Sequence, residues 1–336
     1  MKRAAMFGDG KAGLAECPTP VSKNDLVLVK VHSVPMCTEY KAFKDGYAGE
    51  GFGHEASGEV VEVAQPGMVK VGDRVAVMPQ YPCGKCALCL DGEYIHCQNV
   101  VDVHAATGNT TGTHTYAEYL IKQDWLVIPI PEDISYDHGA MACCGLGPTF
   151  GAMQQMNVTA LDTVLITGMG PVGLGGVINA VHRRARVIVA EIHPYRAQLA
   201  RDLGAEAVID PRDDDAAAQI LDLTGGIGVD KAIDCSGAAP AQRLMIDAVR
   251  RKGQACFVGQ SGDLTIGVSR DMIGKGLTLR GAWHYNRADT PKIMQIIRDS
   301  AALLECFITH TFPMKDVQTA WELQTTGECG KVILNP

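Results

Sequence analysis

Four cysteines follow one another at short intervals in the first third of the 336-residue chain. They are Cys83, Cys86, Cys89 and Cys97, with two, two and seven residues between them. Thiolates at such intervals can close a tetrahedral shell around Zn²⁺, with Zn–S bonds of about 2.3 Å and no open position for a substrate. We therefore expect a structural zinc ion that stabilises a lobe from about residue 81 to residue 100. An iron–sulfur cluster is the alternative, and the second spacing fits zinc better.

A cysteine and a histidine form a second, weaker signal. Cys37 lies 17 positions before His54, and His54 is part of the triplet Gly53-His54-Glu55. Thiolate and imidazole are both zinc ligands, but a catalytic zinc site needs a third protein ligand and an open position. The pair alone therefore does not define a metal site.

The stretch from Thr163 to Glu191 has the period of a strand, a helix and a second strand. Residues 164–166 are apolar and predict a buried strand, residues 174–181 predict a helix, and residues 187–190 predict the next strand. The turn between the first strand and the helix reads Gly168-Met169-Gly170-Pro171-Val172-Gly173. This is the glycine spacing of a dinucleotide-binding βαβ unit, whereas a purely structural glycine turn is the alternative.

Each glycine of this turn has a mechanical reason. Gly168 permits the tight turn, Gly170 lets the backbone approach a pyrophosphate, and Gly173 lets the helix and the strand pack closely. The helix N-terminus then offers free N–H groups to the phosphates. Glu191 stands 21 residues after Gly170, where its carboxylate can accept hydrogen bonds from the adenosine ribose and would repel a 2′-phosphate. We therefore predict that NAD is bound in preference to NADP.

Composition narrows the class of protein. The chain is 46% hydrophobic and 20% charged, which is enough for a large core and favours two domains. Its net charge of −8 is modest and no run of Lys or Arg stands out, which argues against nucleic acid or a membrane as a partner. The sequence shows no signal peptide and no long apolar segment, so we expect a cytoplasmic protein whose twelve cysteines are reduced.

The elements that must position these residues fall into two groups. Short alternating segments at 25–31, 58–63 and 71–77, separated by Pro and Gly turns, predict a mostly β module. After the first βαβ unit, the Rossmann pattern continues with predicted strands at 207–210, 231–234, 255–259 and 277–280.

Taken in order, these motifs resemble the zinc-dependent alcohol and polyol dehydrogenases of the medium-chain dehydrogenase/reductase superfamily. The resemblance covers nearly the whole chain and is carried by Cys37, the Gly53-His54-Glu55 triplet, the four-cysteine lobe, residues 112–120, residues 168–173, Glu191 and residues 330–334. It implies an α/β fold in which a GroES-like, mostly β catalytic domain (1–147 and 288–336) is interrupted by a Rossmann domain with a doubly wound parallel sheet (148–287). It also implies a homodimer or homotetramer that acts on a small-molecule alcohol or ketone.

The resemblance supplies the third ligand of a catalytic zinc. Relatives place it just before the first helix that leads into the cofactor domain, where this sequence has Cys143 and Cys144. Cys144 is our choice because the ligand cysteine of alcohol dehydrogenases is followed directly by glycine, and Cys143 is the alternative. Glu55 matches a residue that lies close to zinc in relatives and ligates it transiently; its other role is to accept a hydrogen bond behind the ligands. The expected total is two zinc ions per chain, one catalytic and one structural.

The sequence departs from the family pattern immediately after the ligand cysteine. Relatives usually have a Ser or Thr two residues on, which carries the alcohol's proton away, and then an Asp that orients the ligand histidine. Here Glu39 takes the hydroxyl position and Tyr40 takes the position of the acid. We hypothesise that Glu39 either accepts the proton or reaches back to hold His54, while Thr38 is less well placed for the relay. A solvated loop glutamate is the alternative.

Other cofactor contacts follow from the resemblance. Arg196 matches a family position near the adenosine and Lys331 one near the pyrophosphate, although either residue could be an ordinary surface charge. Pro171 and Val172 in the glycine turn, and Val258 in the predicted strand 255–259, complete the residues that we expect to bind NAD.

The expected reaction is the reversible, NAD-linked oxidation of a secondary alcohol to a ketone at zinc. His104, Asn109 and His114, together with Glu39, make the catalytic domain more polar than an ethanol pocket requires. This polarity tilts the expected substrate toward a polyol, cyclitol, sugar or amino alcohol. A zinc-free reductase of enones or quinones from the same superfamily, and a non-catalytic NAD-binding protein, are the competing hypotheses.

Overall fold

A computed structural model describes residues 1–260 and 262–336 and divides the chain into two compact units. Unit 1 contains residues 1–145, 286–304 and 308–336, and unit 2 contains residues 146–285 and 305–307. Within the described residues, no helix combines the length and apolar character needed to span a membrane.

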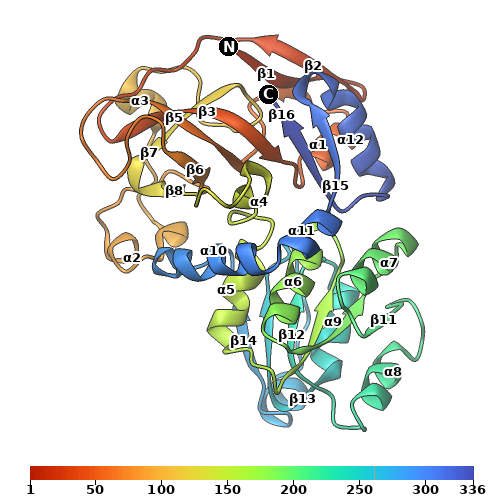
Figure 1. Cartoon of the computed structure of the whole chain (residues 1–336). Coiled ribbons are helices and arrows are strands. Elements are labelled where there is room, and N and C mark those ends of the chain that lie inside the picture. Colours follow the sequence, from red (N-terminus) through yellow and green to blue (C-terminus); the bar gives the residue numbers. More distant parts are fainter. Residues whose placement is uncertain (261) are drawn as a thin grey trace. The chain divides into compact units, whose positions relative to one another are not determined.

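Unit 1 is built on β-sheets (Figure 1). The larger sheet has the strand order β15 (Ile308–Pro313), β16 (Lys331–Asn335), β3 (Leu26–Pro35), β5 (Ala56–Val63), β6 (Arg74–Val77), β8 (Val127–Pro129), and β7 (Tyr119–Gln123) pairs with β3 as well. A smaller sheet has the order β2 (Lys11–Glu16), β1 (Lys2–Gly8), β4 (Ala48–Glu50).

The first residues of strand β3 are buried on both faces of the sheet. Successive side chains of a strand point to opposite faces, so alternate residues must find separate partners. Val27, Val29 and Val31 enter the main core of the unit, whereas Leu26 and Leu28 pack on the other face with Ile121 of β7. The apolar residues at the start of β3 therefore pack on both sides of the sheet. Cys37 follows the other end of this strand by two residues.

Short helices and the C-terminal helix complete unit 1. The helices are α1 (Tyr40–Lys44), α2 (Ala87–Leu90), α3 (Val103–Thr107), α4 (Tyr136–Ala140), α10 (Thr290–Asp299), α12 (Val317–Thr326), and the first residues of α11 (Ala301–Phe307). Trp321 of α12 is fully buried and stacks on Phe43 of α1, with ring centroids 5.6 Å apart. This contact ties the end of the chain to the segment that follows Cys37.

Unit 2 is an α/β Rossmann fold. Its sheet has the order β11 (Ala207–Ile209), β10 (Arg186–Ala190), β9 (Thr163–Thr167), β12 (Val229–Asp234), β13 (Val249–Phe257), β14 (Thr278–Gly281), and neighbouring strands run parallel. Its helices are α5 (Gly147–Met156), α6 (Pro171–His182), α7 (Pro194–Asp202), α8 (Ala216–Leu223) and α9 (Ala239–Ala248).

The strand order places a switch point between β9 and β12. From β9 the chain moves outward to β10 and β11, and it then crosses back to β12 and proceeds to β13. Because crossovers are right-handed, opposite directions of travel put α6 and α7 on one face and α8 and α9 on the other. Contacts of α6 with α7, and of α8 with α9, agree with this arrangement. Doubly wound sheets bind their ligands at the carboxyl ends of the strands beside such a point.

Candidate functional site

Four side chains of unit 1 converge on one point. Ligand atoms of Cys37, His54, Glu55 and Cys144 all lie within 4.8 Å of one another. The sulfur atoms of Cys37 and Cys144 are 3.9 Å apart, far beyond the length of about 2.05 Å expected for a disulfide. Residues more than a hundred positions apart in the sequence thus form one cluster, which we call the mixed cluster.

Hydrogen bonds to the backbone of residues 36 and 37 hold Cys37 just beyond the end of β3. Met36 donates its N–H to the carbonyl of Val332 in β16 at 2.8 Å, and the amide of Gln324 in α12 donates to the carbonyl of Cys37 at 3.3 Å. The side chain of Cys37 is buried. Strand and C-terminal helix together therefore hold the thiol in place.

His54 is oriented by a glycine before it and a carboxylate behind it. Gly53 has φ +89°, and a Cβ at this position would lie 2.2 Å from the ring of Tyr116, so only glycine lets the two segments approach. The Nδ1 atom of His54 lies 3.0 Å from Oε1 of Glu39, and its Nε2 atom lies 3.8 Å from Oε1 of Glu55. Nδ1 is thus occupied by a carboxylate, while Nε2 faces the mixed cluster.

Both carboxylate oxygens of Glu39 accept hydrogen bonds. Besides the contact with His54, its Oε2 atom accepts the backbone N–H of Cys37 at 3.1 Å and the hydroxyl of Tyr116 at 3.1 Å. Burial raises the pKa of Glu39, but the hydrogen bond and charge of His54, together with the other hydrogen bonds of this carboxylate, lower the pKa overall. Of the roles considered for Glu39, this geometry fits the one that holds His54. Thr38, by contrast, is exposed.

Glu55 and Lys331 form a fully buried ion pair. Both side chains are 0% exposed, and Nζ of Lys331 lies 2.7 Å from Oε1 of Glu55. Burial raises the pKa of Glu55 to about 7, although the charge of Lys331 opposes the shift. Lys331 therefore neutralises a carboxylate of the mixed cluster. Its predicted contact with the pyrophosphate stays a prediction.

The structure separates the two neighbouring cysteines. Cys144 contributes its sulfur to the mixed cluster, whereas Cys143 is fully buried and donates its thiol to the backbone carbonyl of His54 at 3.5 Å. Burial also raises the pKa of Cys143 well above its ordinary value. Cys143 thus has the environment of a protonated core thiol.

The donor set of the mixed cluster fits a zinc ion. The hydrogen bond from Cys144 lowers the pKa of Cys37 well below its ordinary value, and the same contact raises that of Cys144. Burial lowers the pKa of His54, but its bonds with Cys37 and Glu39 raise it overall. In a tetrahedral shell with Zn–S bonds of about 2.3 Å, two sulfurs are about 3.8 Å apart, close to the 3.9 Å between Cys37 and Cys144.

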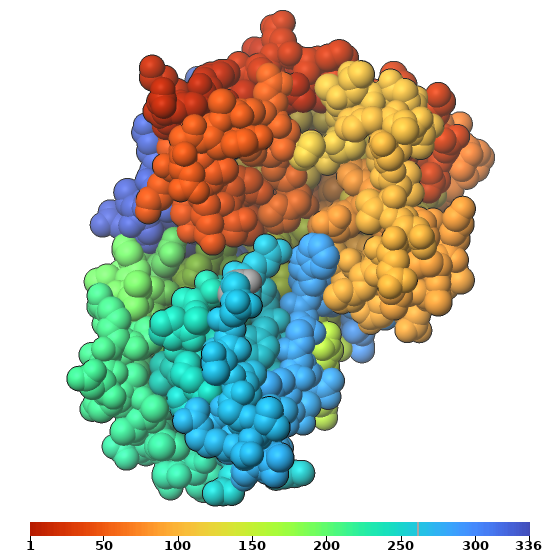
Figure 2. All heavy atoms as spheres, turned by 180° about the vertical axis from the view of Figure 1, so that it is seen from behind, coloured from red at the N-terminus to blue at the C-terminus, as the bar shows by residue number. Residues whose placement is uncertain are grey.

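The four cysteines of the lobe also converge. The distance between sulfur atoms is 3.5 Å for Cys86 and Cys89, 3.8 Å for Cys86 and Cys97, and 3.6 Å for Cys83 and Cys97. The backbone N–H of Lys85 is the main cause that lowers the pKa of Cys83 to about 6. These distances also fit a tetrahedral shell around zinc. The lobe (orange in Figure 2) lies at the surface of unit 1.

The glycine turn of unit 2 has the geometry of a phosphate cradle. Gly168 has φ +82°, and a Cβ on Gly173 would lie 1.9 Å from the carbonyl oxygen of Gly168, so the strand and helix approach closely. A Cβ on Gly170, just before α6, would meet nothing within 4 Å. Open space at the N-terminus of this helix is where a pyrophosphate would fit.

Three further predicted cofactor residues, Glu191, Arg196 and Val258, lie in the same unit. The carboxylate of Glu191 accepts the backbone N–H of Met169 at 2.5 Å and that of His193 at 2.8 Å. Arg196 has a buried Nε atom without a hydrogen-bond acceptor among the described residues. Val258 follows β13 and donates its N–H to the carbonyl of Asp234. The buried Nε of Arg196 and the open space at Gly170 fit a dinucleotide.

Comparisons with known proteins identify the family. Residues 23–132 match the alcohol dehydrogenase GroES-like domain, and residues 171–299 match the zinc-binding dehydrogenase domain. The chain is 30% identical to an uncharacterized zinc-type alcohol dehydrogenase-like protein of Escherichia coli, covering 100% of this chain and 98% of that protein. It is also 30% identical to sorbitol dehydrogenase of Bacillus subtilis, with 100% and 97% covered. The chain belongs to the zinc-type alcohol dehydrogenase family.

Further relatives of this family differ in substrate. The chain is 31% identical to an L-threonine 3-dehydrogenase of Pyrococcus horikoshii, covering 96% of this chain and 94% of that protein. Among solved structures, an alcohol dehydrogenase from Thermotoga maritima is 26% identical with a TM-score of 0.85, covering 100% of this chain and 99% of that chain. An alcohol dehydrogenase from Thermus sp. ATN1 shares the fold, with a TM-score of 0.89 at 22% identity and full coverage of both chains. The chain is accordingly an NAD-linked dehydrogenase acting on CH–OH groups, and the family's cofactors are NAD and zinc.

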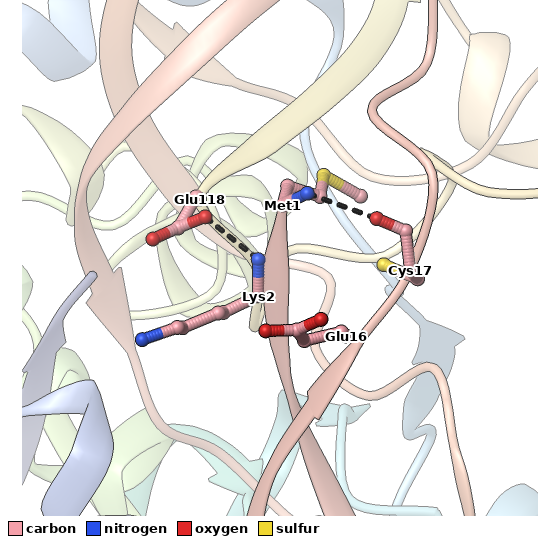
Figure 3. A pocket seen from close by; sticks show the side chains of 5 residues that line it. All are labelled: Met1, Lys2, Glu16, Cys17 and Glu118. Carbon is pink, nitrogen blue, oxygen red and sulfur yellow. Dashed lines mark hydrogen bonds between the residues drawn. The ribbon is translucent and has the colours of Figure 1, made fainter.

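Two hollows of unit 1 differ in their relation to the mixed cluster. The larger, of about 490 Å³, is lined by Met1, Lys2, Glu16, Cys17 and Glu118, and Figure 3 shows hydrogen bonds from the backbone nitrogens of Met1 and Lys2 across it. The amine of Met1 donates to the carbonyl of Cys17 at 2.9 Å, and the N–H of Lys2 donates to Glu118. The smaller, of about 250 Å³, includes His54 in its wall. The smaller cavity is therefore the one that can serve this dehydrogenase.

Not all of the polar residues that the sequence suggested for substrate binding line this cavity. His114 lines it, whereas His104 bonds to the carbonyl of Asn109 at 2.7 Å, and Asn109 bonds in turn to the backbone of Val21. Sequence reasoning did not point to Tyr116 or Lys122. A tyrosine within residues 112–120, a segment that carries the family resemblance, was the one signal that could have drawn attention to Tyr116.

Proposed function

We propose that this dehydrogenase reversibly oxidises a secondary alcohol of a polyol, cyclitol, sugar or amino alcohol to the ketone, with one catalytic and one structural zinc per chain. Residues 1–147 and 288–336 would serve catalysis and residues 148–287 would bind NAD. The observation that carries the proposal is the convergence of Cys37, His54 and Cys144, with Glu55 as an occasional fourth ligand.

The residues of the mixed cluster have separate tasks. Zinc, when bound, supplies a Lewis acid for the substrate oxygen, and NAD⁺ accepts the hydride. Cys37 and Cys144 would provide negative charge to the metal, and His54 would bind it through Nε2 because Glu39 occupies Nδ1. Lys331 balances Glu55, so that this buried carboxylate remains near the ligands without an unpaired charge.

On the cofactor side, the backbone N–H groups after Gly170 would hold the pyrophosphate, and Glu191 the adenosine ribose. Arg196 would lie near the adenosine, and Pro171, Val172 and Val258 would complete the contacts. A homodimer or homotetramer is part of the proposal, and sedimentation equilibrium would distinguish the two.

Metal analysis combined with a turnover assay tests the proposal. The purified protein should contain two zinc ions per chain and should form NADH with at least one alcohol from a panel of polyols, cyclitols, sugars and amino alcohols. The variant Cys37→Ser should retain one zinc, keep its fold and lose turnover. Full turnover by Cys37→Ser would refute the ligand assignment, and one zinc per wild-type chain would favour a zinc-free reductase.

A further inference from the structure

The cavity beside His54 has the size of a small-molecule site, and its lining combines apolar residues with a few polar groups. Its volume of about 250 Å³ suits a small substrate. The polar part of its lining includes Gln80, Tyr81, residues 113–115 and Lys122 of β7. Within the described part of the chain, no Asp or Glu lines this cavity.

Lys122 is buried in this lining with an incomplete set of partners. Its side chain is 2% exposed, donates to the carbonyl of Gln80 and lies 4.0 Å from the ring centroid of Tyr81. Gln80 has φ +66°, a conformation that L-residues avoid, and its carbonyl is the one that Lys122 binds. An ammonium group has three N–H donors, so a carbonyl and a ring face leave donor capacity for a ligand.

The other buried lysines show what Lys122 lacks. Lys331 lies 2.7 Å from Glu55, and Lys231 lies 2.8 Å from Asp162. Among the described residues, no carboxylate forms an ion pair with Lys122. Burial accordingly lowers the pKa of Lys122 to about 7. A buried ammonium without a counter-charge is costly, and an anionic ligand would remove that cost.

A second buried donor lies in the same lining. Thr115 is 4% exposed, and its hydroxyl has no hydrogen-bond partner among the residues that the structure describes. It lies beside Gly53, since a Cβ on Gly53 would be 2.3 Å from that hydroxyl, and both residues line the cavity. The cavity therefore combines a hydroxyl and an ammonium, both with unused capacity, and His54 of the mixed cluster.

We propose that Lys122 binds an anionic group, a carboxylate or a phosphate, on the alcohol that this enzyme oxidises, with Thr115 as an additional donor. The inference rests on the proposed function because His54 in the same cavity marks where the reacting carbon would lie. It narrows the substrate class from polar alcohols in general to hydroxy acids, amino acids with a hydroxyl group, and sugar or polyol phosphates.

Matched substrate pairs test the inference on the unmodified holoenzyme. One pair is 3-hydroxybutyrate and methyl 3-hydroxybutyrate, and the other is sorbitol 6-phosphate and sorbitol. In at least one pair, kcat/KM for the anion should exceed that for its neutral partner by about 10- to 100-fold, as charge-assisted hydrogen bonds provide. The pair that responds distinguishes carboxylate from phosphate. Turnover of neutral alcohols without a preference for either anion would overturn the inference and leave the proposed function intact.

A binding measurement addresses the site without turnover. Butyrate, butyramide and inorganic phosphate are titrated into the holoenzyme by calorimetry at constant ionic strength. We expect butyrate or phosphate to bind at least tenfold more tightly than butyramide, and Lys122→Met to abolish the difference. The control is Lys30→Met, which removes an exposed lysine on the neighbouring strand, opposite Tyr119. Equal binding of all three probes to the wild-type enzyme would refute the inference even if Lys122→Met does not fold.

Discussion

Replacing Glu39 tests how the metal-facing nitrogen of His54 is selected. The carboxylate of Glu39 accepts hydrogen bonds from Nδ1 of His54, the N–H of Cys37 and the hydroxyl of Tyr116, at 3.0, 3.1 and 3.1 Å. Loss of such an outer partner of a metal-binding histidine typically costs about 10- to 100-fold in metal affinity or activity. We expect Glu39→Ala to reach the upper end of this range, since all three donors lose their acceptor.

The variant Glu39→Gln is more informative because it keeps the shape of the side chain. Its amide oxygen can still accept from Nδ1 of His54, but its NH₂ group then faces the N–H of Cys37, and neither of these groups can accept. The hydroxyl of Tyr116 can rotate to accept instead. One of three bonds is therefore replaced by a repulsive contact, and we expect a loss of about tenfold in zinc affinity.

Zinc affinity is measured by competition with a chromophoric chelator, in parallel with kcat/KM. In Glu39→Gln and Glu39→Ala, the more weakly bound of the two expected zinc ions should be released more readily, while the zinc of the four-cysteine lobe is retained. Tyr116→Phe is the matched control, because it removes one donor and leaves the bond to His54. Tight binding of both ions together with normal kcat/KM in Glu39→Ala would refute the orienting role.

Further predictions concern the cofactor turn, the lobe and the stability of unit 2. Gly170→Ala should keep its thermal stability and weaken NADH binding by roughly tenfold or more in fluorescence titrations, whereas Gly173→Ala should lower stability by about 1–3 kcal/mol, because its Cβ would lie 1.9 Å from a backbone oxygen. Cys89→Ser should lose one zinc per chain and lower the melting temperature, and unchanged zinc content would contradict the assignment of the lobe. Arg270 and Arg243 lower the pKa of Asp271, so this carboxylate should stabilise unit 2 above pH of about 4 and lose its effect as the pH falls. The stability deficit of Asp271→Asn in urea should therefore shrink below that pH, and a constant deficit would contradict the argument.

Features that depend on local spacing were predictable from the sequence. The glycine turn is one, because Gly168, Gly170 and Gly173 act within a single strand-turn-helix segment whose apolar period is visible. The prediction of the α/β fold with a GroES-like and a Rossmann part is confirmed by the structure and by the family matches. The close spacing of Cys83, Cys86, Cys89 and Cys97 likewise sufficed to predict one cluster, and their sulfurs do converge.

The mixed cluster could not be derived from spacing. Cys37 and Cys144 are separated by 107 positions, and only the resemblance to known dehydrogenases brought them together. The direction of the Glu39 side chain was open, because a residue beside a loop can point to solvent or back to the site. The burial of Lys122 could not be predicted from the sequence for a different reason. A lysine inside a strand normally indicates the solvent face, and only the structure shows that this face of β7 is covered.

The position of Glu39 has a consequence for the proton that leaves the alcohol. In the dehydrogenases that this chain resembles, a hydroxyl residue stands here and an Asp follows. In this chain Tyr40 packs against the apolar core, and Glu39 contacts His54 instead. Glu39 precedes α1, and its longer side chain reaches His54 from one position earlier. Since both carboxylate oxygens already accept hydrogen bonds, Glu39 is poorly suited to carry the proton, which should leave through water in the cavity beside His54. The pH profile of kcat in Glu39→Gln, measured at saturating zinc, should then keep its wild-type shape, and the loss of a titrating limb would show that Glu39 carries the proton.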